Sequence, residues 1–250
     1  MRALVISDIH SNLEALEAVL AAAPGYDQVW NLGDTVGYGA SPNEVAETSR
    51  RLGGLVVRGN HDRASSHDAD ISDFNSEGAR AILWTREVLT VENRAWLAGL
   101  PPGPLTPNGS DVACVHGTPA DEDEYLISSA HAVVALYDHP ASIILFGHTH
   151  RQNGFIKTDL DWYQPEPQFD SRTGFASHEL PLHPDARYLL NPGSVGQPRD
   201  RDWRAAFALY DAERALFTWY RAPYVVAQAQ ARIRNAGLPG RLADRLAVGI

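Results

Sequence analysis

The 250-residue sequence predicts an α/β fold, and three observations lead to this prediction. In the first 150 residues, short apolar runs rich in β-branched side chains alternate with segments whose apolar residues recur at helical spacing. From Arg151 onward the pattern changes to short runs of strand type. No internal repeat, low-complexity tract or linker divides the chain. We therefore expect a single domain over residues 1–250, with a core at 1–221 and a helical tail at 222–250.

The first half of the chain is expected to alternate strands and helices. Ser41-Pro42-Asn43-Glu44 has the form of a capping box with proline at the first helical position, which predicts a helix start. The order strand, helix, strand, helix, strand is typical of parallel strands joined by right-handed crossovers. Strands are expected at residues 3–6, 29–32, 55–58, 111–115 and 142–146, and helices at 12–23, 41–52, 72–100 (as two helices) and 129–138.

The second half is expected to be mainly β-structure, followed by two helices. Residues 158–173 are predicted to form a long loop, and because loops of this length are often functional, we expect a wall or lid of a substrate pocket. The tail helices, separated at 237–240, could pack on the domain itself or on a partner chain in a homo-oligomer. Strands are expected at residues 151–157, 175–180, 188–190, 205–210 and 216–220, with a turn at 211–214.

Side chains that bind metals follow five of the apolar runs. Ligands of open α/β sheets bind at the carboxyl ends of the strands, so we expect these side chains to meet. Oxygen and nitrogen donors suit manganese, iron or zinc rather than calcium. One zinc ion takes three or four protein ligands, so seven donors predict two ions about 3.5–4 Å apart that share a carboxylate. The seven residues are Asp8, His10, Asp34, Asn60, His116, His148 and His150.

Composition and charge exclude several other classes of protein. The net charge of -10 argues against a stable complex with nucleic acid, which needs a basic face. The single cysteine, Cys114, allows no intrachain disulfide and no thiolate metal cluster. No apolar run reaches the ~20 residues that span a bilayer, and the chain starts directly with a strand rather than a signal peptide. We expect a cytoplasmic protein without a membrane partner.

The five motifs, taken in order, resemble those of the calcineurin-like metallophosphoesterase superfamily. They are Asp8-Ile9-His10, Gly33-Asp34, Gly59-Asn60-His61-Asp62, His116-Gly117 and Gly147-His148-Thr149-His150. The resemblance extends from Met1 to about Asp211. Residues 33–39 and 191–200 also resemble the small bacterial single-domain, phosphodiesterase-like branch of this superfamily. The resemblance implies a four-layer sandwich of two mixed β-sheets flanked by α-helices.

The resemblance also implies a role for each site residue. One metal would be held by Asp8, His10, Asp34 and His150, and the other by Asp34, Asn60, His116 and His148. A water or hydroxide between two divalent ions (Mn²⁺, Fe²⁺/Fe³⁺ or Zn²⁺, with Mn²⁺ expected to support activity) would attack the phosphate ester. His61 would be the general acid, and Asp62 would orient it. Asn12 and Arg199 are candidates for substrate contact, and Asn12 could instead cap a helix.

One departure from the family pattern bears on the substrate. Protein phosphatases of this superfamily read Gly-Asp-x-Val-Asp-Arg-Gly, and here Gly37-Tyr38-Gly39 replaces the last three residues, so the phosphate-clamping arginine is missing. We therefore expect a phosphodiesterase that acts on small nucleotide-like esters. The alternatives are a phosphomonoesterase or phosphoprotein phosphatase, a non-catalytic metal-binding scaffold, and a nuclease. The pocket walls are expected in the 158–173 loop, around Tyr38 and in residues 66–74.

Overall fold

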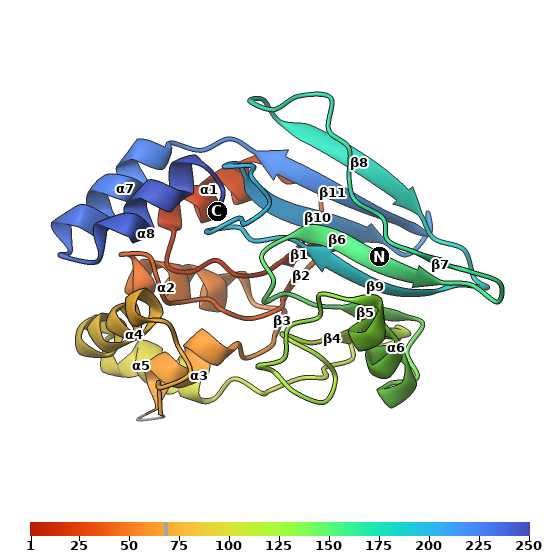
Figure 1. Ribbon diagram of the computed structural model, residues 1–250, viewed down its shortest axis with the longest axis horizontal. Coiled ribbons are helices and arrows are strands. Elements are labelled where there is room, and N and C mark those ends of the chain that lie inside the picture. Colours follow the sequence, from red (N-terminus) through yellow and green to blue (C-terminus); the bar gives the residue numbers. More distant parts are fainter. Residues whose placement is uncertain (68–69) are drawn as a thin grey trace.

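The computed structural model describes residues 1–67 and 70–250 and contains two mixed β-sheets packed face to face between helices (Figure 1). The strands are β1 (Arg2–Ile6), β2 (Gln28–Asn31), β3 (Leu55–Val56), β4 (Val112–Cys114), β5 (Ile143–Leu145), β6 (Gln152–Lys157), β7 (Trp162–Tyr163), β8 (Ala176–Pro181), β9 (Arg187–Pro192), β10 (Ala205–Asp211) and β11 (Leu216–Ala222). The helices are α1 (Leu13–Ala22), α2 (Pro42–Leu52), α3 (Asn60–Ser66), α4 (Ser76–Val88), α5 (Val91–Ala98), α6 (Ser129–Asp138), α7 (Val226–Asn235), α8 (Gly240–Asp244) and the 3₁₀ turn η1 (Arg245–Ala247).

Each sheet combines a parallel part with an antiparallel part. The first sheet has the order β3-β2-β1-β10-β11-β8, in which β1, β2 and β3 are parallel. The second has the order β4-β5-β9-β6-β7, in which β4, β5 and β9 are parallel. The parallel strands bring their carboxyl ends to one edge. The predicted sandwich of two mixed sheets is therefore confirmed.

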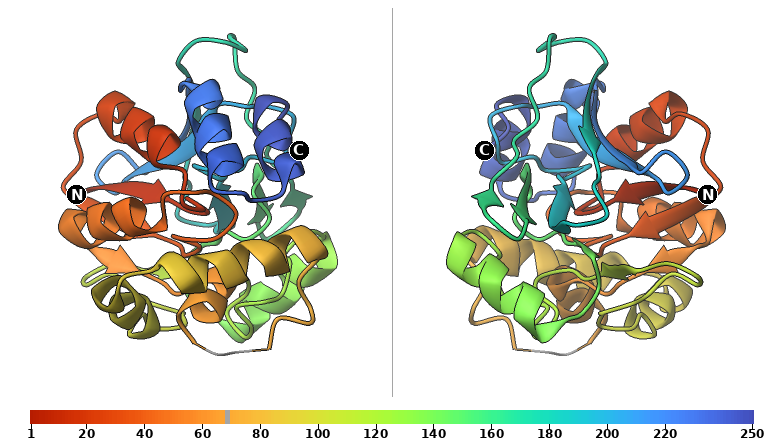
Figure 2. Two further views of the ribbon diagram at one scale, coloured as in Figure 1. Left: turned by 90° about the vertical axis from the view of Figure 1, so that its left-hand side faces the viewer. Right: turned by 90° about the vertical axis from the view of Figure 1, so that its right-hand side faces the viewer.

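Successive side chains of β1 point to opposite faces of the first sheet, and this alternation explains the layers of the fold. Leu4 and Ile6 point to one face and pack in a buried cluster with α1, α7 and α8. Ala3 and Val5 point to the other face and pack between the two sheets with side chains such as Trp219. A third buried cluster joins the far face of the second sheet to α6. The order is thus helices, sheet, sheet and helix (Figure 2).

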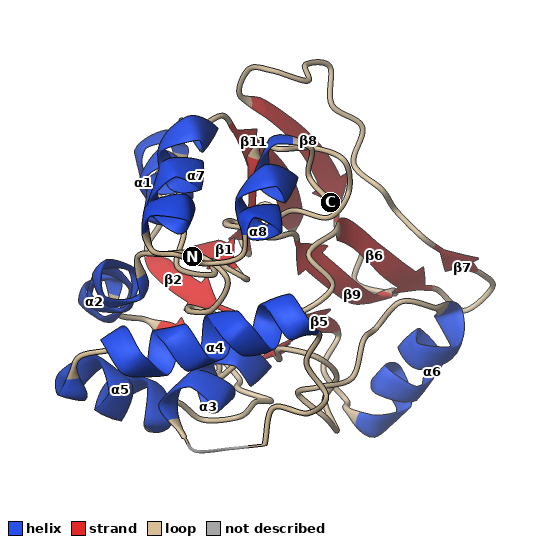
Figure 3. Ribbon diagram, turned by 60° about the vertical axis from the view of Figure 1, so that its left-hand side comes forward, coloured by secondary structure: helices blue, strands red, loops and turns tan. Residues whose placement is uncertain are grey.

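The helices α3, α4 and α5 pack together beside the loop that follows β2. Helix α3 contacts α4 and α5, and Figure 3 shows these three helices together, apart from α6. The tail helix α7 packs against α1 of its own chain, which is one of the two arrangements that the sequence leaves open. Among the described residues, no helix combines the length and the apolar character that crossing a bilayer requires.

Most elements lie where the sequence predicts them, with small differences. The predicted loop 158–173 contains the two-residue strand β7, which pairs with the end of β6. The strand expected at 55–58 is only two residues long, because Arg58 N–H donates to Pro101 O and leaves the sheet. The sequence does not predict helix α3. It begins directly after Gly59, a cap without a side-chain hydrogen bond, and is only seven residues long.

Candidate metal centre

The seven predicted ligand side chains lie together at one edge of the two sheets. All of them follow the carboxyl ends of β1, β2, β4 and β5 except Asn60, the first residue of α3. Backbone hydrogen bonds hold neighbouring loops side by side: Asp8 N–H donates to Gly33 O at 2.9 Å, and His10 N–H donates to Asp34 O at 3.0 Å. All seven side chains are buried: Asp8, His10, Asp34, Asn60, His116, His148 and His150.

Four of these residues form a first cluster. The candidate ligand atoms of Asp8, His10, Asp34 and His150 all lie within 4.8 Å of one another. His10 Nε2 is 3.5 Å from Asp34 Oδ2 and 3.0 Å from His150 Nε2. His150 Nε2 is 3.3 Å from Asp8 Oδ1. Donors that bind one ion at about 2.0–2.2 Å are separated by about these distances.

A second cluster shares Asp34 with the first. The candidate ligand atoms of Asp34, His116 and His148 also lie within 4.8 Å of one another. His116 Nε2 is 3.3 Å from Asp34 Oδ2 and 3.2 Å from Asn60 Oδ1, so Asn60 lies beside the same cluster. Asp34 Oδ2 therefore faces His10 on one side and His116 on the other. A carboxylate between two sets of nitrogen donors is what a two-metal centre requires.

Backbone carbonyl groups fix the tautomers of three ligand histidines. Because a carbonyl oxygen only accepts, the facing Nδ1 must carry the proton, which leaves the Nε2 lone pair for a cation. The three contacts are His10 Nδ1 to Val36 O at 3.0 Å, His116 Nδ1 to Leu32 O at 2.8 Å and His150 Nδ1 to Gln197 O at 2.6 Å.

His148 is oriented in the opposite way. Its Nε2 lies 3.1 Å from Asp123 O, so Nε2 donates and Nδ1 keeps the free lone pair. The ring of Tyr125 stacks on His148 with centroids 3.8 Å apart and holds the imidazole from its other face. Neither contact has a signal in the sequence, since Asp123 and Tyr125 come from a loop that resembles a solvated acidic segment.

Two features of the clusters fit divalent cations independently of the motifs. His10 Nε2 and His150 Nε2 face each other at 3.0 Å as two lone pairs, with their protons on the opposite nitrogens. Asp8 Oδ1 is buried and has no hydrogen-bond partner among the described residues. Lone pairs and an unpaired buried oxygen are costly unless a positive charge lies between them. The donor set therefore fits the metal ions that the sequence predicts.

Burial and neighbouring charges shift the pKa values of the cluster in different directions. Burial lowers the pKa of His10 and that of His150 well below the usual range, so both rings are neutral and can bind a cation. Burial raises the pKa of Asp8 to about 7. Burial also raises the pKa of Asp34, but His116 and His61 outweigh it and hold that pKa well below its usual range. Burial alone would lower the pKa of His116. The negative charges of Asp34 and Asp8 have a larger opposite effect and raise this pKa to about 10.

Many residues of this centre have left-handed backbone conformations. Such φ values are uncommon for residues other than glycine, and Asp, Asn and His tolerate them best. They re-aim each chain sharply as it leaves its strand, which turns the side chain into the cluster. The residues are Asp8 (φ 52°), His10 (49°), Ser11 (55°), Asp34 (54°), Tyr38 (55°), His148 (62°) and His150 (59°).

His61 and Asp62 lie at the start of α3, next to the clusters. The His61 ring is surrounded by the rings of Tyr38, His10 and Phe74, with centroids 4.4, 4.9 and 4.9 Å away. Its Nδ1 is buried without a hydrogen-bond partner among the described residues, and burial lowers the pKa of His61 to about 4. Its backbone N–H donates to Asp34 Oδ1 at 2.8 Å.

Asp62 does not contact the His61 ring by a hydrogen bond among the described residues. Its carboxylate instead accepts from Val36 N–H and from Gly59 N–H, each at 3.1 Å. It thereby joins the loop after β2 to the first turn of α3. Any orientation of His61 by Asp62 acts through the backbone of that turn.

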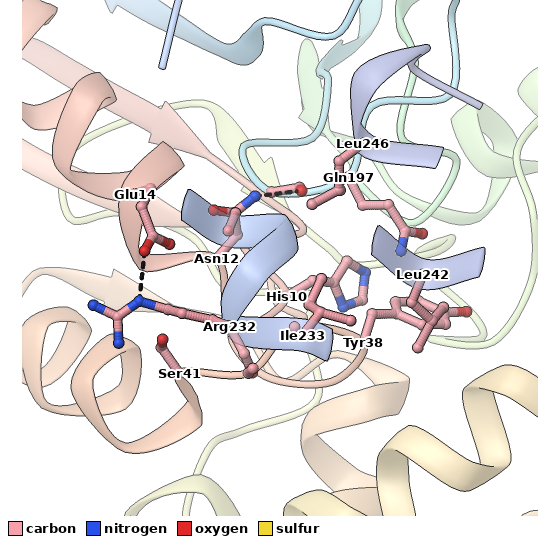
Figure 4. Close-up of a pocket in the computed structure, with 15 residues that line it drawn as sticks. His10, Asn12, Glu14, Tyr38, Ser41, Gln197, Arg232, Ile233, Leu242 and Leu246 are labelled. Atoms are coloured by element: carbon pink, nitrogen blue, oxygen red, sulfur yellow. Dashed lines mark hydrogen bonds and ion pairs between the residues drawn. The ribbon is translucent and has the colours of Figure 1, made fainter. Parts of the chain in front are cut away.

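The two predicted substrate contacts differ in their surroundings. Asn12 is buried and caps α1: its Oδ1 accepts from Ala15 N–H at 3.1 Å, and its amide donates to Gly196 O at 2.9 Å. It lines a narrow crevice together with His10 and with Ile233, Leu242 and Leu246 of the C-terminal helices (Figure 4). Asn12 is thus fully used in structural hydrogen bonds, and its contact with substrate stays a prediction.

Arg199 lies beside the metal cluster and over Tyr38. Its guanidinium carbon is 5.7 Å from the centroid of the Tyr38 ring, and Nη2 is 3.0 Å from Gln197 Oε1. Tyr38 itself packs on His10 with ring centroids 4.7 Å apart. Of the predicted wall at 66–74, Phe74 contacts the His61 ring, whereas residues 68–69 lie outside the described part of the chain.

Gly59→Ala is expected to weaken metal binding. A Cβ at Gly59 would lie 2.1 Å from Asp34 Oδ1 and 2.3 Å from Asp34 N, so the shared carboxylate would have to move. Displacement of groups that support metal ligands costs about 10–100-fold in metal affinity. Metal content after dialysis, measured by plasma mass spectrometry, checks this. Gly240→Ala is the control, since nothing lies within 4 Å of a Cβ there, and equal metal content in both variants would contradict the prediction.

Comparisons with known proteins agree with this geometry. Residues 1–215 match the calcineurin-like phosphoesterase superfamily domain. The chain is 38% identical to an uncharacterized protein of Methanocaldococcus jannaschii, over 98% of this chain and 97% of that one. It is similar to the crystal structure of a metallophosphoesterase from Sphaerobacter thermophilus, with a TM-score of 0.85 and 36% identity. The match covers 100% of this chain and 99% of that one.

A hypothetical protein from Pyrococcus horikoshii shares the fold, with a TM-score of 0.75, 19% identity and coverage of 100% of this chain and 98% of that one. Family and site together indicate a metal-dependent phosphoester hydrolase. The chain belongs to the calcineurin-like phosphoesterase superfamily.

Proposed function

We propose that the protein is a two-metal phosphodiesterase that hydrolyses small nucleotide-like phosphate diesters. The observation that carries this proposal is Asp34 Oδ2, which faces a nitrogen donor of each cluster, His10 at 3.5 Å and His116 at 3.3 Å. Asp8, His10, Asp34 and His150 would hold one ion, and Asp34, Asn60, His116 and His148 the other. Divalent ions bound there would lower the pKa of a water toward neutrality and neutralise charge on the phosphate oxygens.

The side chains around the clusters would position the ester and its leaving group. His61 has one ring nitrogen, Nδ1, buried against Gly37, so Nε2 is the atom that can face the leaving oxygen. It would donate a proton there once the negative charge of the bound phosphate has raised the pKa of the ring. Asp62 holds the turn that carries His61 through its bonds to Val36 and Gly59. In this proposal His61 acts on the leaving oxygen, and Asp62 acts on the backbone segment that positions His61.

The preference for a diester rests on the charge available to the phosphate. Tyr38 occupies the position where protein phosphatases of this family carry an arginine. Arg199, which comes from the loop after β9, places its guanidinium over the Tyr38 ring, and we propose that it contacts a phosphate oxygen there. A singly charged diester needs less positive charge than a doubly charged monoester. One guanidinium together with the ions would therefore suit a diester.

A direct comparison of two chromogenic esters tests this function. The protein is stripped of metal and reloaded with Mn²⁺, and initial rates are measured on bis(p-nitrophenyl) phosphate and on p-nitrophenyl phosphate. We expect a higher kcat/KM for the diester, with Asp34→Ala as the blank. A higher value for the monoester would instead support a phosphomonoesterase. No rate above the blank on either ester, with two ions bound, would support the scaffold alternative.

The proposal extends to the activating ion, the cellular location and the exclusion of a scaffold role. We infer Mn²⁺ as the activating ion because hard oxygen and imidazole donors are mixed in both clusters, and parallel reloading with Fe²⁺ and Zn²⁺ tests this. The presence of all seven donors together with His61 supports catalysis over a scaffold role. We also propose a cytoplasmic location, and the acidic composition supports the absence of a stable nucleic-acid complex.

A further inference from the structure

A polar cleft of about 500 Å³ adjoins the metal centre. One wall is the segment 166–172, part of the predicted loop 158–173, and the opposite wall is the segment 199–204 after β9. Gln152 and Asn153, at the start of β6, line it between the two walls. Small-molecule sites are commonly clefts of about 300–1,000 Å³, so this space is large enough for a nucleotide-sized group.

The cleft and the metal centre share two segments of chain. Arg151 lines the cleft directly after the candidate ligand His150. Arg199 lines it as well, while its backbone N–H donates to His150 O at 3.0 Å and its guanidinium lies over Tyr38 at the metal centre. A molecule bound at the metals can therefore extend along Arg199 into the cleft.

The cleft carries an excess of positive charge, although the chain as a whole is acidic. Two of its arginines are neutralised: Arg204 pairs with Asp202 and Arg221 pairs with Asp200. In the part of the chain that the structure describes, four others have no carboxylate partner, and the unpaired acidic side chain facing them is Glu166. These four are Arg151, Arg172, Arg199 and Arg201.

Contacts between an aromatic ring and two arginines join the walls of the cleft. The Phe169 ring lies under the guanidinium groups of Arg204 and Arg221, 5.6 and 5.8 Å from its centroid, which ties the two walls together. The buried Nε of Arg199 has no hydrogen-bond partner within the described residues. A buried donor without a partner is unfavourable, and an anion in the cleft would satisfy it. Guanidinium groups bind phosphate oxygens in this way.

We propose that this cleft binds a second phosphate group of the substrate, one that is not hydrolysed. The inference rests on the proposed function, since it places the scissile ester at the metal centre and the further phosphate beyond Arg199. It narrows the substrate class to small phosphate esters that carry at least two phosphates. A long nucleic acid is not favoured, because it would bring many phosphate charges against a chain whose net charge is -10.

Two matched esters test the inference on the Mn²⁺-loaded enzyme. Thymidine 5′-(p-nitrophenyl phosphate) carries one phosphate, and its 3′-phosphorylated form carries the same scissile bond and a second phosphate. We expect the wild-type enzyme to prefer the 3′-phosphorylated ester by about tenfold or more in kcat/KM, through a lower KM, since a charge-assisted contact contributes about that factor. The double variant Arg172→Gln/Arg201→Gln is expected to lose most of this preference.

A control variant and a binding measurement complete the experiment. Arg50→Gln/Arg214→Gln removes the same charge at two exposed positions away from the cleft and should keep the preference. Calorimetry on the Mn²⁺-loaded proteins compares thymidine 3′,5′-bisphosphate with thymidine 5′-monophosphate. Tighter binding of the bisphosphate that depends on Arg172 and Arg201 supports the cleft even if neither ester is hydrolysed, in which case only the proposed function fails. Equal turnover of both esters and equal binding of both nucleotides would overturn the inference and leave the function intact.

Discussion

Replacement of Asp34 by alanine is expected to remove both metal ions and to lower kcat/KM for a phosphodiester by about a thousandfold or more. Asp34 Oδ2 lies 3.5 Å from His10 Nε2 and 3.3 Å from His116 Nε2, so the variant takes a ligand from each proposed ion. Bound metals contribute several kcal/mol to transition-state stabilisation, and about 1.4 kcal/mol corresponds to a tenfold rate. Metal content and initial rates with excess Mn²⁺ are the measurements.

The surroundings of Asp34 make this variant informative only if it still folds. Its Oδ1 accepts from His61 N–H at 2.8 Å, so circular dichroism and thermal unfolding should accompany the assay. Asp138→Ala, at the exposed end of α6, is the matched control and should keep two ions and full activity. A folded Asp34→Ala protein that retains two ions and near-normal turnover would be incompatible with the proposed centre.

His61→Asn is expected to lower kcat by about 10²–10⁴ while both metal ions stay bound. General acid catalysis contributes a factor of this size, and the His61 side chain is not among the candidate ligands. The loss should depend on the leaving group. Nitrophenolate leaves without needing a proton, so the rate on the nitrophenyl ester should fall less. An alkyl alcohol needs a proton to leave, so the rate on the alkyl ester should fall more. Rates on a p-nitrophenyl ester and on a methyl ester of the same nucleotide separate the two effects.

The comparison with a surface histidine completes this test. His183→Asn changes an exposed imidazole and should leave both rates and the metal content unchanged. If His61→Asn slows both esters by the same factor, the side chain orients the phosphate group rather than supplying a proton. If the His61→Asn variant loses metal, the His61 side chain supports the turn that carries Asp34. That result would contradict its proposed role as the general acid.

The sequence predicts that these donors lie together because they follow a simple rule of chain geometry. Asp8, Asp34, His116 and His148 come soon after buried parallel strands, and parallel strands deliver their carboxyl ends to a common edge. That rule needs only the apolar runs and the residues that follow them. The alternation of Leu4 and Val5 between two buried layers is predictable for the same reason.

The parts that could not be predicted depend on contacts between distant segments. Helix α3 is too short to show a helical period, and Gly59 offers no capping side chain to mark its start. The pairing of Tyr38 with Arg199 joins positions that are 161 residues apart. The same holds for the carbonyl groups that set the histidine tautomers, since any residue type can supply a carbonyl.

The left-handed backbone of the ligand residues has a consequence for directed evolution. Each non-glycine residue in this conformation costs about 1–3 kcal/mol, whereas glycine adopts it freely and loses only about 0.5–1 kcal/mol through its greater freedom in the unfolded chain. Selection for heat resistance alone would therefore favour glycine at positions such as His148 or Asp8. A library screened without metal is expected to become more stable by erasing its own active site. Screening with Mn²⁺ present should preserve these residues, because metal binding then stabilises the folded state that they form.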